Sequence, residues 1–259
     1  MSSDITLLSL AVDLAERAGA EILAIRARGF QVQRKADHSL VTEADHAAEA
    51  LILAGLRQAL PGCVVIAEEA VAAGVVTPAT AEFWLVDPLD GTREFTGGGT
   101  DFAVNIGLVR GGKPVLGVVG APASHEVFSG IAGVGAWRQN DGRRTPIAAR
   151  PPPPEGLTVV ASRHHGDQPR LDAYLAGRTV AGVVNFGSSL KFCRVAEGQA
   201  DLYPRFGRTM EWDTCAPQAV LEAAGGSVET LDGGRLRYGK AGWDNPHFVC
   251  WGRRPGGHS

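Results

Sequence analysis

The chain has 259 residues, of which 44% are hydrophobic and 20% charged, and its formal net charge at pH 7 is -3. This composition is ordinary for a globular protein, and the slight negative charge argues against a protein that binds the nucleic-acid backbone. No stretch reaches the roughly 20 apolar residues of a membrane helix, and the first residues lack the layout of a signal peptide.

Periodic apolar residues predict two helices at the start of the chain. The first is marked by Leu7, Ala11, Leu14, Ala15, Ala18 and Ile22 and ends at Gly29. The second begins at Thr42 and ends at Pro61-Gly62, with an inner face of Ala48, Leu51, Ile52 and Leu56. Strands are predicted at Cys63–Ala67, Phe83–Val86, Phe102–Val109 and Pro114–Val119, the last two joined by a hairpin at 110–113. The pattern indicates two helices against a largely antiparallel sheet.

Four consecutive prolines, Pro151–Pro154, divide the chain, because they cannot join a helix and favour an extended connector. Beyond them, strands are predicted at Leu157–Ser162, Val183–Phe186 and Ala200–Tyr203, and helices at 188–197 and 214–224. This alternation is typical of α/β structure. We therefore predict an α+β half over residues 1–150 and an α/β half over residues 151–259, with a frayed tail from Arg253.

Six acidic side chains end or interrupt apolar stretches: Asp45, Glu68, Glu69, Asp87, Asp90 and Asp213. If the fold brought them together, they would repel one another and raise each other's pKa unless cations neutralised them. Oxygen ligands with no nearby His or Cys suit Mg²⁺ better than zinc. The pattern therefore predicts a metal-dependent phosphoryl-transfer enzyme.

The run Asp87-Pro-Leu-Asp-Gly-Thr92 is the most specific of these signals. Its two carboxylates, with the Leu89 carbonyl between them, can converge on one or two cations, and the Thr92 hydroxyl can hold a water. Taken alone, the run is also compatible with an ordinary turn after a strand.

Each other acid has a structural alternative. Asp45 fits a capping box that begins at Thr42. Glu68-Glu69 fits a strand end that emerges into solvent, and Asp213 fits the N-cap of the helix after it. These alternatives are adequate one at a time, but the joint occurrence of the acids favours the metal site.

Three segments resemble the signature regions of the inositol monophosphatase superfamily, the lithium-sensitive, magnesium-dependent phosphatases. They are Ala67–Glu69, Asp87–Thr92 and Glu211–Asp213, and the resemblance extends from the first helix to about Trp251. Within that superfamily the chain is most similar to the CysQ-type 3'(2'),5'-bisphosphate nucleotidases. The stretches that carry this closer similarity are Lys35–Thr42, Gly91–Phe95, Gly187–Cys193, Leu202–Phe206 and Tyr238–Pro246. The resemblance implies a layered αβαβα sandwich with the active site between the halves.

The resemblance also implies roles for individual residues. The implied metal ligands are Glu68 (preferred to Glu69 as the first acid of its pair), Asp87, the Leu89 carbonyl, Asp90 and Asp213. The implied catalytic residues are Asp45, Glu68, Asp90 and Thr92, with Asp45 at a further metal or its water and Thr92 orienting the nucleophile. The implied substrate-binding residues are Gly91, Thr92, Ser188, Ser189, Lys191, Arg205 and Asp213.

Lys191 and Arg205 are suited to a second phosphate, although solvent-facing basic groups are the alternative. The implied reaction is removal of the 3'-phosphate from 3'-phosphoadenosine 5'-phosphate, with two or three Mg²⁺ ions and Mn²⁺ as a substitute. Another superfamily activity, on inositol monophosphate, fructose bisphosphate or histidinol phosphate, is one alternative. A noncatalytic metal- or nucleotide-sensing protein is the other.

The expected partner is a small phosphorylated nucleotide, with no nucleic acid and no integral membrane segment, and the expected state is a monomer or homodimer. The expected location is the cytoplasm, with peripheral attachment to the bacterial inner membrane as the alternative. The four cysteines, Cys63, Cys193, Cys215 and Cys250, stand too far apart for a zinc or redox motif. His38 and Arg93 depart from the common family residues, and Arg163–His165 is expected to be a surface loop.

Overall fold

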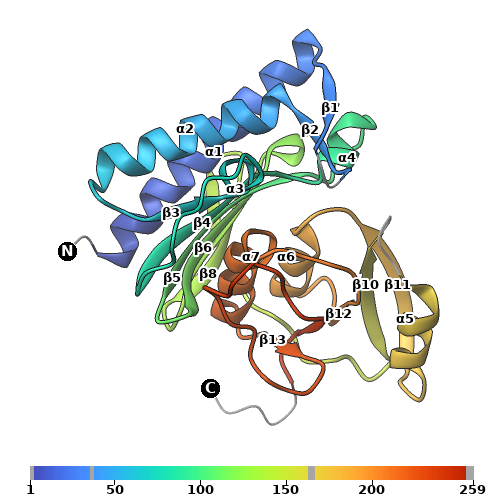
Figure 1. Ribbon diagram of the computed structural model, residues 1–259. Helices are drawn as coiled ribbons and strands as arrows, with labels where there is room; N and C mark the ends of the chain where they lie inside the picture. The colour runs from blue at the N-terminus through green and yellow to red at the C-terminus, as the bar shows by residue number, and fades with distance from the viewer. Residues whose placement is uncertain (1–2, 36–37, 163–166, 255–259) are drawn as a thin grey trace.

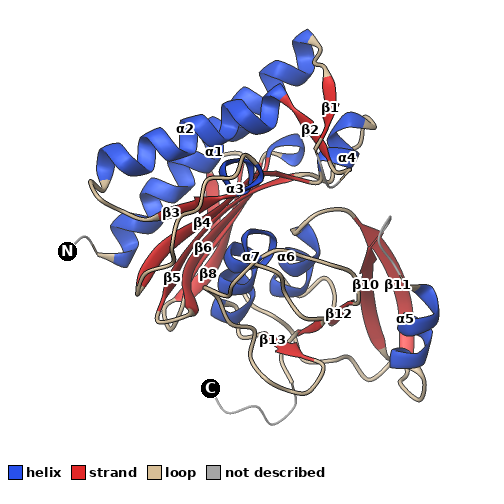
Figure 2. Ribbon diagram, viewed as in Figure 1, coloured by secondary structure: helices blue, strands red, loops and turns tan. Residues whose placement is uncertain are grey.

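The computed structural model describes residues 3–35, 38–162 and 167–254, so the predicted loop at 163–165 and the end of the tail lie outside the described residues. Its layers follow one another as helices, sheet, helices, sheet and helix (Figures 1 and 2). The prediction of an αβαβα sandwich is therefore confirmed. None of the described helices has the length and apolar character needed to cross a bilayer.

The first layer consists of α1 (Asp4–Arg28) and α2 (Glu43–Ala59), which lie side by side over the first sheet (Figure 1). Ser3 caps α1, and Gly29 ends it with a positive φ of 85°. The residues predicted for the inner face of α1 are all buried. Thr42 and Asp45 form the predicted capping box at the start of α2. Both helix predictions are thus confirmed.

The first sheet has seven strands in the order β3-β4-β5-β6-β7-β8-β9. Their bounds are β3 Val65–Ala67, β4 Glu82–Asp90, β5 Ala103–Arg110, β6 Lys113–Ala121, β7 Glu126–Ile131, β8 Gly135–Asn140 and β9 Arg143–Ile147. Only β3 and β4 pair in parallel, so the expectation of a largely antiparallel sheet is correct. Strands β7, β8 and β9 were not predicted. Strands β8 and β9 are mostly half-exposed or exposed and lack a clear apolar alternation, whereas β7 is buried throughout.

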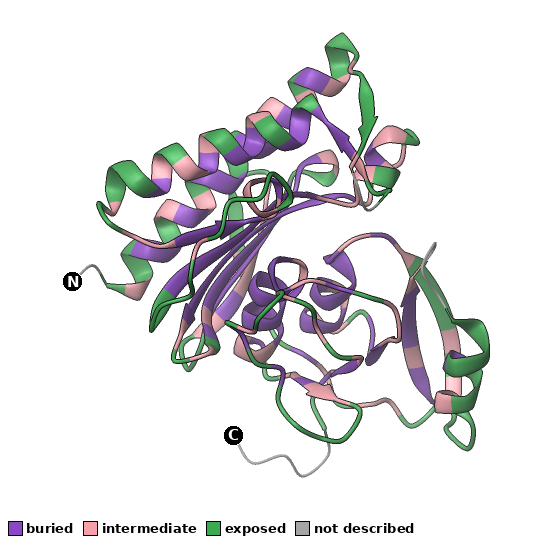
Figure 3. Ribbon diagram, in the orientation of Figure 1, coloured by how far each residue is buried: buried purple, intermediate pink, exposed green. Residues whose placement is uncertain are grey.

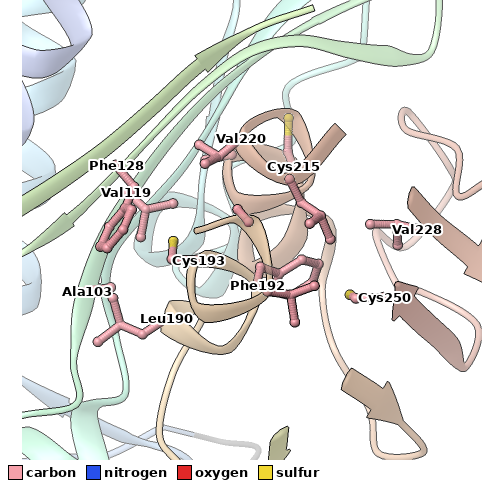
Figure 4. Packing of buried hydrophobic residues seen from close by; sticks show 14 of the residues in the cluster. Ala103, Val119, Phe128, Leu190, Phe192, Cys193, Cys215, Val220, Val228 and Cys250 are labelled. Carbon is pink, nitrogen blue, oxygen red and sulfur yellow. The ribbon is translucent and has the colours of Figure 1, made fainter. Parts of the chain in front are cut away.

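The middle layer consists of α6 (Leu190–Ala196) and α7 (Glu211–Ala223). Glycines of three neighbouring strands let α7 lie against the first sheet: a Cβ on Gly107, Gly117 or Gly130 would come within 3 Å of α7 atoms. Figure 4 shows Cys193 of α6 facing Phe128 of the first sheet, and Phe192 on the side of the second sheet. One apolar core therefore joins both sheets through this layer.

The second sheet has the order β11-β10-β12-β14-β13. Its bounds are β10 Leu157–Ser162, β11 Val180–Phe186, β12 Leu202–Arg205, β13 Ser227–Thr230 and β14 Phe248–Trp251. Strand β10 is parallel to β11 and β12, as α/β alternation predicts, but β14 is antiparallel to its neighbours. Helix α5 (Gln168–Leu175) covers the outer face through Leu171. Figure 3 shows β10 largely buried, whereas β11 at the edge of this sheet and the outer surface of α5 are largely exposed.

Short elements complete the described part of the chain: β1 (Val32–Arg34), β2 (Leu40–Thr42), α3 (Glu68–Ala72), α4 (Thr92–Thr96) and the 3-10 helix η1 (Pro122–Ser124). The first sheet ends at Ile147 and the second begins at Leu157, on either side of the prolines. The division into two folding halves at residue 150 stays a prediction.

Candidate active site

The ends of β3 and β4 and the start of α7 deliver acidic side chains to one cleft of about 750 Å³. Strand β4 contributes Asp87 and Asp90, the start of α3 directly after β3 contributes Glu68, and α7 contributes Asp213. Ser188, Ser189, Lys191 and Arg205 line the same cleft, as do Leu89, Gly91 and Thr92. The structure therefore brings almost the whole predicted set together.

Three carboxylates form the centre of the cleft. One oxygen each of Glu68, Asp87 and Asp213 lies within 4.8 Å of the other two. Burial raises the pKa of Asp87 well above its usual range, and the charges of Glu68 and Asp90 raise it further. Burial likewise raises the pKa of Asp213, with added repulsion from Asp90 and Glu68. Asp87 is thus buried, and the half-buried Glu68 and Asp213 face it.

The charge and the oxygen donors of the cluster suit a divalent cation. Ionised carboxylates that are buried together lose hydration and repel one another, so they need a neutralising partner. The three facing residues offer only hard oxygen atoms, the donors that Mg²⁺, Mn²⁺ and Ca²⁺ prefer. We therefore treat Glu68, Asp87 and Asp213 as the candidate metal ligands.

Asp213 is not the N-cap of its helix, which corrects the predicted boundary. Helix α7 begins at Glu211 rather than Thr214, and Asp213 occupies its third position. The Met210 amide donates a hydrogen bond of 2.8 Å to Asp213 Oδ2. Because this bond closes the first turn, the helix starts three residues earlier than the apolar pattern indicated.

Thr92 links the end of β4 to Asp45 of α2. Its hydroxyl oxygen lies 3.1 Å from Asp45 Oδ1 and 3.1 Å from the Leu89 carbonyl oxygen. The other oxygen of Asp45 accepts hydrogen bonds of 2.7 Å from the amide and the hydroxyl of Thr42. The predicted capping box therefore holds one oxygen of Asp45, and the other oxygen contacts Thr92, which the sequence did not indicate; the contact of Asp45 with a further metal or its water stays a prediction.

Gly91 makes the turn between β4 and α4. Its φ of 93° favours glycine, and a Cβ there would lie 2.8 Å from the Asp101 carbonyl oxygen. This turn brings the Thr92 hydroxyl back over the carbonyl of Leu89. A glycine is thus required where the predicted motif has one.

The sequence analysis assigned no role to Lys35, yet its ammonium lies 2.6 Å from Oε1 of both Glu68 and Glu69. Burial alone would lower the pKa of Lys35, but the two carboxylates outweigh it and raise that pKa. Burial and the Glu68 charge raise the pKa of Glu69 to about 7. Lys35 begins the stretch Lys35–Thr42 that carries the family similarity, and this position was the signal that could have identified it. Glu69 is buried, so its solvent-facing alternative is wrong.

Ser189 connects the second half of the chain to Asp90. Its amide donates to Asp90 Oδ2, and its hydroxyl donates a 2.8 Å hydrogen bond to Asn105 Oδ1. Ser189 was predicted to contact the substrate, and these bonds add a positioning contact that the sequence did not indicate. Asn105 was missed, although a polar residue within the apolar run 102–109 was a signal.

The opposite wall of the cleft is basic. Lys191 is only 4% exposed, so the solvent-facing alternative is wrong for it. Burial is the main cause that lowers its pKa to about 8, although Asp90 opposes this effect. Its ammonium donates to the carbonyls of Ser188 and Phe186. Arg205 donates to the Arg208 carbonyl, while its buried Nε has no hydrogen-bond partner among the described residues.

We expect the melting temperature of the metal-free protein to fall as the pH rises from about 5 to about 8. Glu68, Glu69, Asp87 and Asp213 all have raised pKa values in the folded state. Such groups stabilise the fold below their unfolded pKa, and that contribution is lost as the pH rises through the folded pKa. Calorimetry in EDTA and in saturating Mg²⁺ measures the effect. An equal pH dependence in both buffers would contradict the assignment of these acids to a cation.

Comparisons with known proteins show the family of the chain. Residues 5–249 match the model of the inositol monophosphatase family. The 3'(2'),5'-bisphosphate nucleotidase CysQ of Escherichia coli K12 is 45% identical over 230 residues, which cover 87% of this chain and 91% of that protein. The protein of the same name from Buchnera aphidicola is 39% identical over 210 residues, 81% of this chain and 78% of its own.

Solved structures support the same relationship. CysQ from Bacteroides thetaiotaomicron, described as a bacterial member of the inositol monophosphatase family, has a TM-score of 0.80 at 34% identity. The match covers 96% of this chain and 98% of that one. The inositol monophosphatase of Anabaena sp. PCC 7120 has a TM-score of 0.76 at 26% identity and covers 97% and 92% of the two chains. The chain therefore belongs to the inositol monophosphatase family.

Proposed function

We propose that this protein is a metal-dependent phosphatase that hydrolyses 3'-phosphoadenosine 5'-phosphate to AMP and phosphate, a 3'(2'),5'-bisphosphate nucleotidase. The observation that carries the proposal is that one cleft combines three facing carboxylates with a buried lysine. The carboxylates suit cations at the phosphate that is cleaved, and the lysine suits a second phosphate. Relatives that are named for this activity support the choice of substrate.

The proposed metal is Mg²⁺, as two or three ions, with Mn²⁺ as a substitute. Its proposed ligands are Glu68, Asp87, the Leu89 carbonyl, Asp90 and Asp213. When bound, such ions lower the pKa of a coordinated water and offset the charge on the leaving oxygen. The chain supplies the fixed oxygen atoms, and the Ser189 amide holds Asp90 in place.

Thr92 and Asp45 are the proposed groups that orient the attacking water. A threonine hydroxyl has one proton and two acceptor sites, so Thr92 can donate to Asp45 or Leu89 and still accept from a water. Asp45 is held by Thr42, which leaves its Oδ1 as the acceptor toward Thr92. The backbone amides of Gly91 and Thr92 are the proposed donors to the phosphate that is cleaved.

Lys191 and Arg205 are the proposed donors to the second phosphate, with Ser188 beside them. The Lys191 ammonium lies in the interior and donates hydrogen bonds only to carbonyl oxygens among the described contacts, so no carboxylate is hydrogen-bonded to it. The Arg205 Nε is a buried donor that no described residue satisfies. A phosphate at this wall would satisfy both groups by charge-assisted hydrogen bonds.

A substrate panel tests the proposal. Purified protein with Mg²⁺ should release phosphate from 3'-phosphoadenosine 5'-phosphate with a higher kcat/KM than from inositol monophosphate, fructose bisphosphate or histidinol phosphate. Lithium should inhibit the reaction, as the family resemblance implies. No phosphate release from any of these compounds would favour a noncatalytic sensing protein. A preference for one of the other three would reassign the substrate.

We propose a monomer or homodimer in the cytoplasm, with peripheral attachment to the inner membrane as the alternative. Sedimentation of the purified protein distinguishes a monomer from a homodimer. Cell fractionation distinguishes the cytoplasm from attachment to the inner membrane.

A further inference from the structure

A buried carboxylate outside the predicted set lies two residues before Asp213. Glu211 is fully buried, and its oxygens accept hydrogen bonds from the amides of Gly239 and Lys240 at 2.7 and 2.9 Å. The Lys240 ammonium adds an ion pair of 2.6 Å. The Glu211 amide in turn donates to the Trp243 carbonyl at 2.9 Å. Glu211 thus ties one segment, Tyr238–Pro246, to the start of α7, and we call it the clamp segment.

Asn245 of the clamp segment makes a second set of ties to the same helix start. Its side-chain amide donates to the Met210 carbonyl at 2.8 Å and to the Thr214 hydroxyl at 3.0 Å. Its backbone amide donates to the Thr209 carbonyl at 2.9 Å. Asp244 pairs with Met210 in an isolated β-bridge. Met210 is therefore held through its backbone by two neighbouring residues of the clamp segment.

Met210 in turn orients Asp213, one member of the carboxylate cluster. Its amide donates the 2.8 Å hydrogen bond to Asp213 Oδ2. A carboxylate with one oxygen held in this way has a defined rotation, so the side chain keeps an oxygen near those of Glu68 and Asp87. The clamp segment is thus linked to the cluster through Met210 and the first turn of α7.

We infer that Glu211 is a positioning residue for the metal site: it locks the clamp segment onto α7, and the segment fixes the Met210 amide that orients Asp213. The inference rests on the proposed metal-dependent function. Ligand orientation by residues that do not touch the metal is a general property of such sites, and loss of such a contact weakens metal affinity or activity by about 10–100-fold.

The charge of Glu211 is essential to this role. The carboxylate is enclosed by donors alone, two amides and an ammonium. A Gln side chain has one acceptor oxygen and one donor group, so one of the amides would face another donor. Glu211→Gln also leaves the Lys240 ammonium, whose side chain is 30% exposed, without its counterion. An unpaired buried donor costs more than the net value of the bond itself, so the segment should loosen.

The test measures binding of Mn²⁺ alone by isothermal titration calorimetry, on full-length folded protein. Glu211→Gln should raise the Kd for Mn²⁺ by about tenfold. The KM for the bisphosphate nucleotide at saturating Mn²⁺ should change less than about twofold, because Glu211 is not in the wall that holds the second phosphate. Lys240→Met keeps the carboxylate and both amides, so its Kd should rise less, by about threefold.

Asp201→Asn is the matched control. Asp201 is equally buried and accepts from Arg150 and from the Thr158 amide, away from the cluster. Its loss should lower the melting temperature and leave the Kd for Mn²⁺ unchanged. A folded Glu211→Gln protein with the wild-type Kd, or an Asp201→Asn protein with an equal rise, would overturn the inference.

If Glu211→Gln does not fold, Lys240→Met is used to test the inference instead. A wild-type Kd for Mn²⁺ in that variant overturns the inference, and a raised Kd supports it. Mn²⁺ binding by the wild-type protein tests the proposed function separately from the role of Glu211. Wild-type protein that binds no Mn²⁺ would remove the metal-dependent function itself, whereas normal wild-type binding with an unaffected variant removes only the role of Glu211.

Discussion

Asp87→Asn is expected to lower kcat/KM for phosphate release by at least about a hundredfold and to raise the melting temperature of the metal-free protein. Asp87 is buried and faces Glu68 and Asp213 within 4.8 Å. Its replacement removes one anionic ligand, so bound cations lose a fixed charge at the point where the reaction needs them. In the absence of metal, the same change removes a buried carboxylate that its neighbours repel.

The opposite signs of these two effects make the test specific. A substitution that merely damages the fold lowers both activity and melting temperature. Phosphate release in Mg²⁺ and calorimetry in EDTA are measured on the same preparation. Asp13→Asn, which changes an exposed carboxylate of α1, is the control and should leave both quantities unchanged. An Asp87→Asn protein as active as wild type would refute the role of Asp87 as a metal ligand.

Lys191→Met is expected to raise the KM for 3'-phosphoadenosine 5'-phosphate by about 30–100-fold, close to the value of a hydrogen bond to a charged group. The KM for 3'-AMP, which lacks the second phosphate, should stay within about twofold. The reason is that Lys191 lies on the basic wall and is buried, so its charge meets an anion with little competition from water.

The pH dependence supplies a second measurement of the same role. Burial lowers the pKa of Lys191 to about 8, so its ammonium is charged below that pH and becomes neutral above it. The KM of the wild-type enzyme for the bisphosphate should therefore rise above pH 8, and Lys191→Met should lack this rise. Lys113→Met, on the exposed hairpin between β5 and β6, is the control. An equal loss with both substrates would place Lys191 at the phosphate that is cleaved.

The site was largely predictable where chemistry is concentrated in short motifs. The segment from Asp87 to Thr92 carries two acids, a required glycine and a hydroxyl within six residues, and it lines the cleft. Its metal-binding role stays a prediction. The capping box of Thr42 and Asp45 was readable for the same reason, because both partners lie within one helical turn.

The strands were predictable only where their apolar patterns are strong. The run that became β4 was identified, but its extension to Asp90 was not, since Pro88 and the register shift between Asp87 and Asp90 interrupt the ladder. Strands β8 and β9 were not predicted because strands that are largely half-exposed or exposed carry little apolar periodicity. An apolar alternation arises where one face of a strand is buried, and few residues of β8 and β9 are buried.

The sequence by itself determined the first helices, the strongest strands and the acidic motifs, because hydrophobic periodicity and motif spacing are properties of neighbouring residues. The family and its layered fold came from the resemblance that those motifs carry. Only the tertiary structure decided which distant groups meet: Lys35 on Glu68 and Glu69, Ser189 on Asp90 and Asn105, and Glu211 on the clamp segment. These contacts join residues up to 99 positions apart. No local preference encodes them, since each contact joins segments that only the tertiary fold brings together.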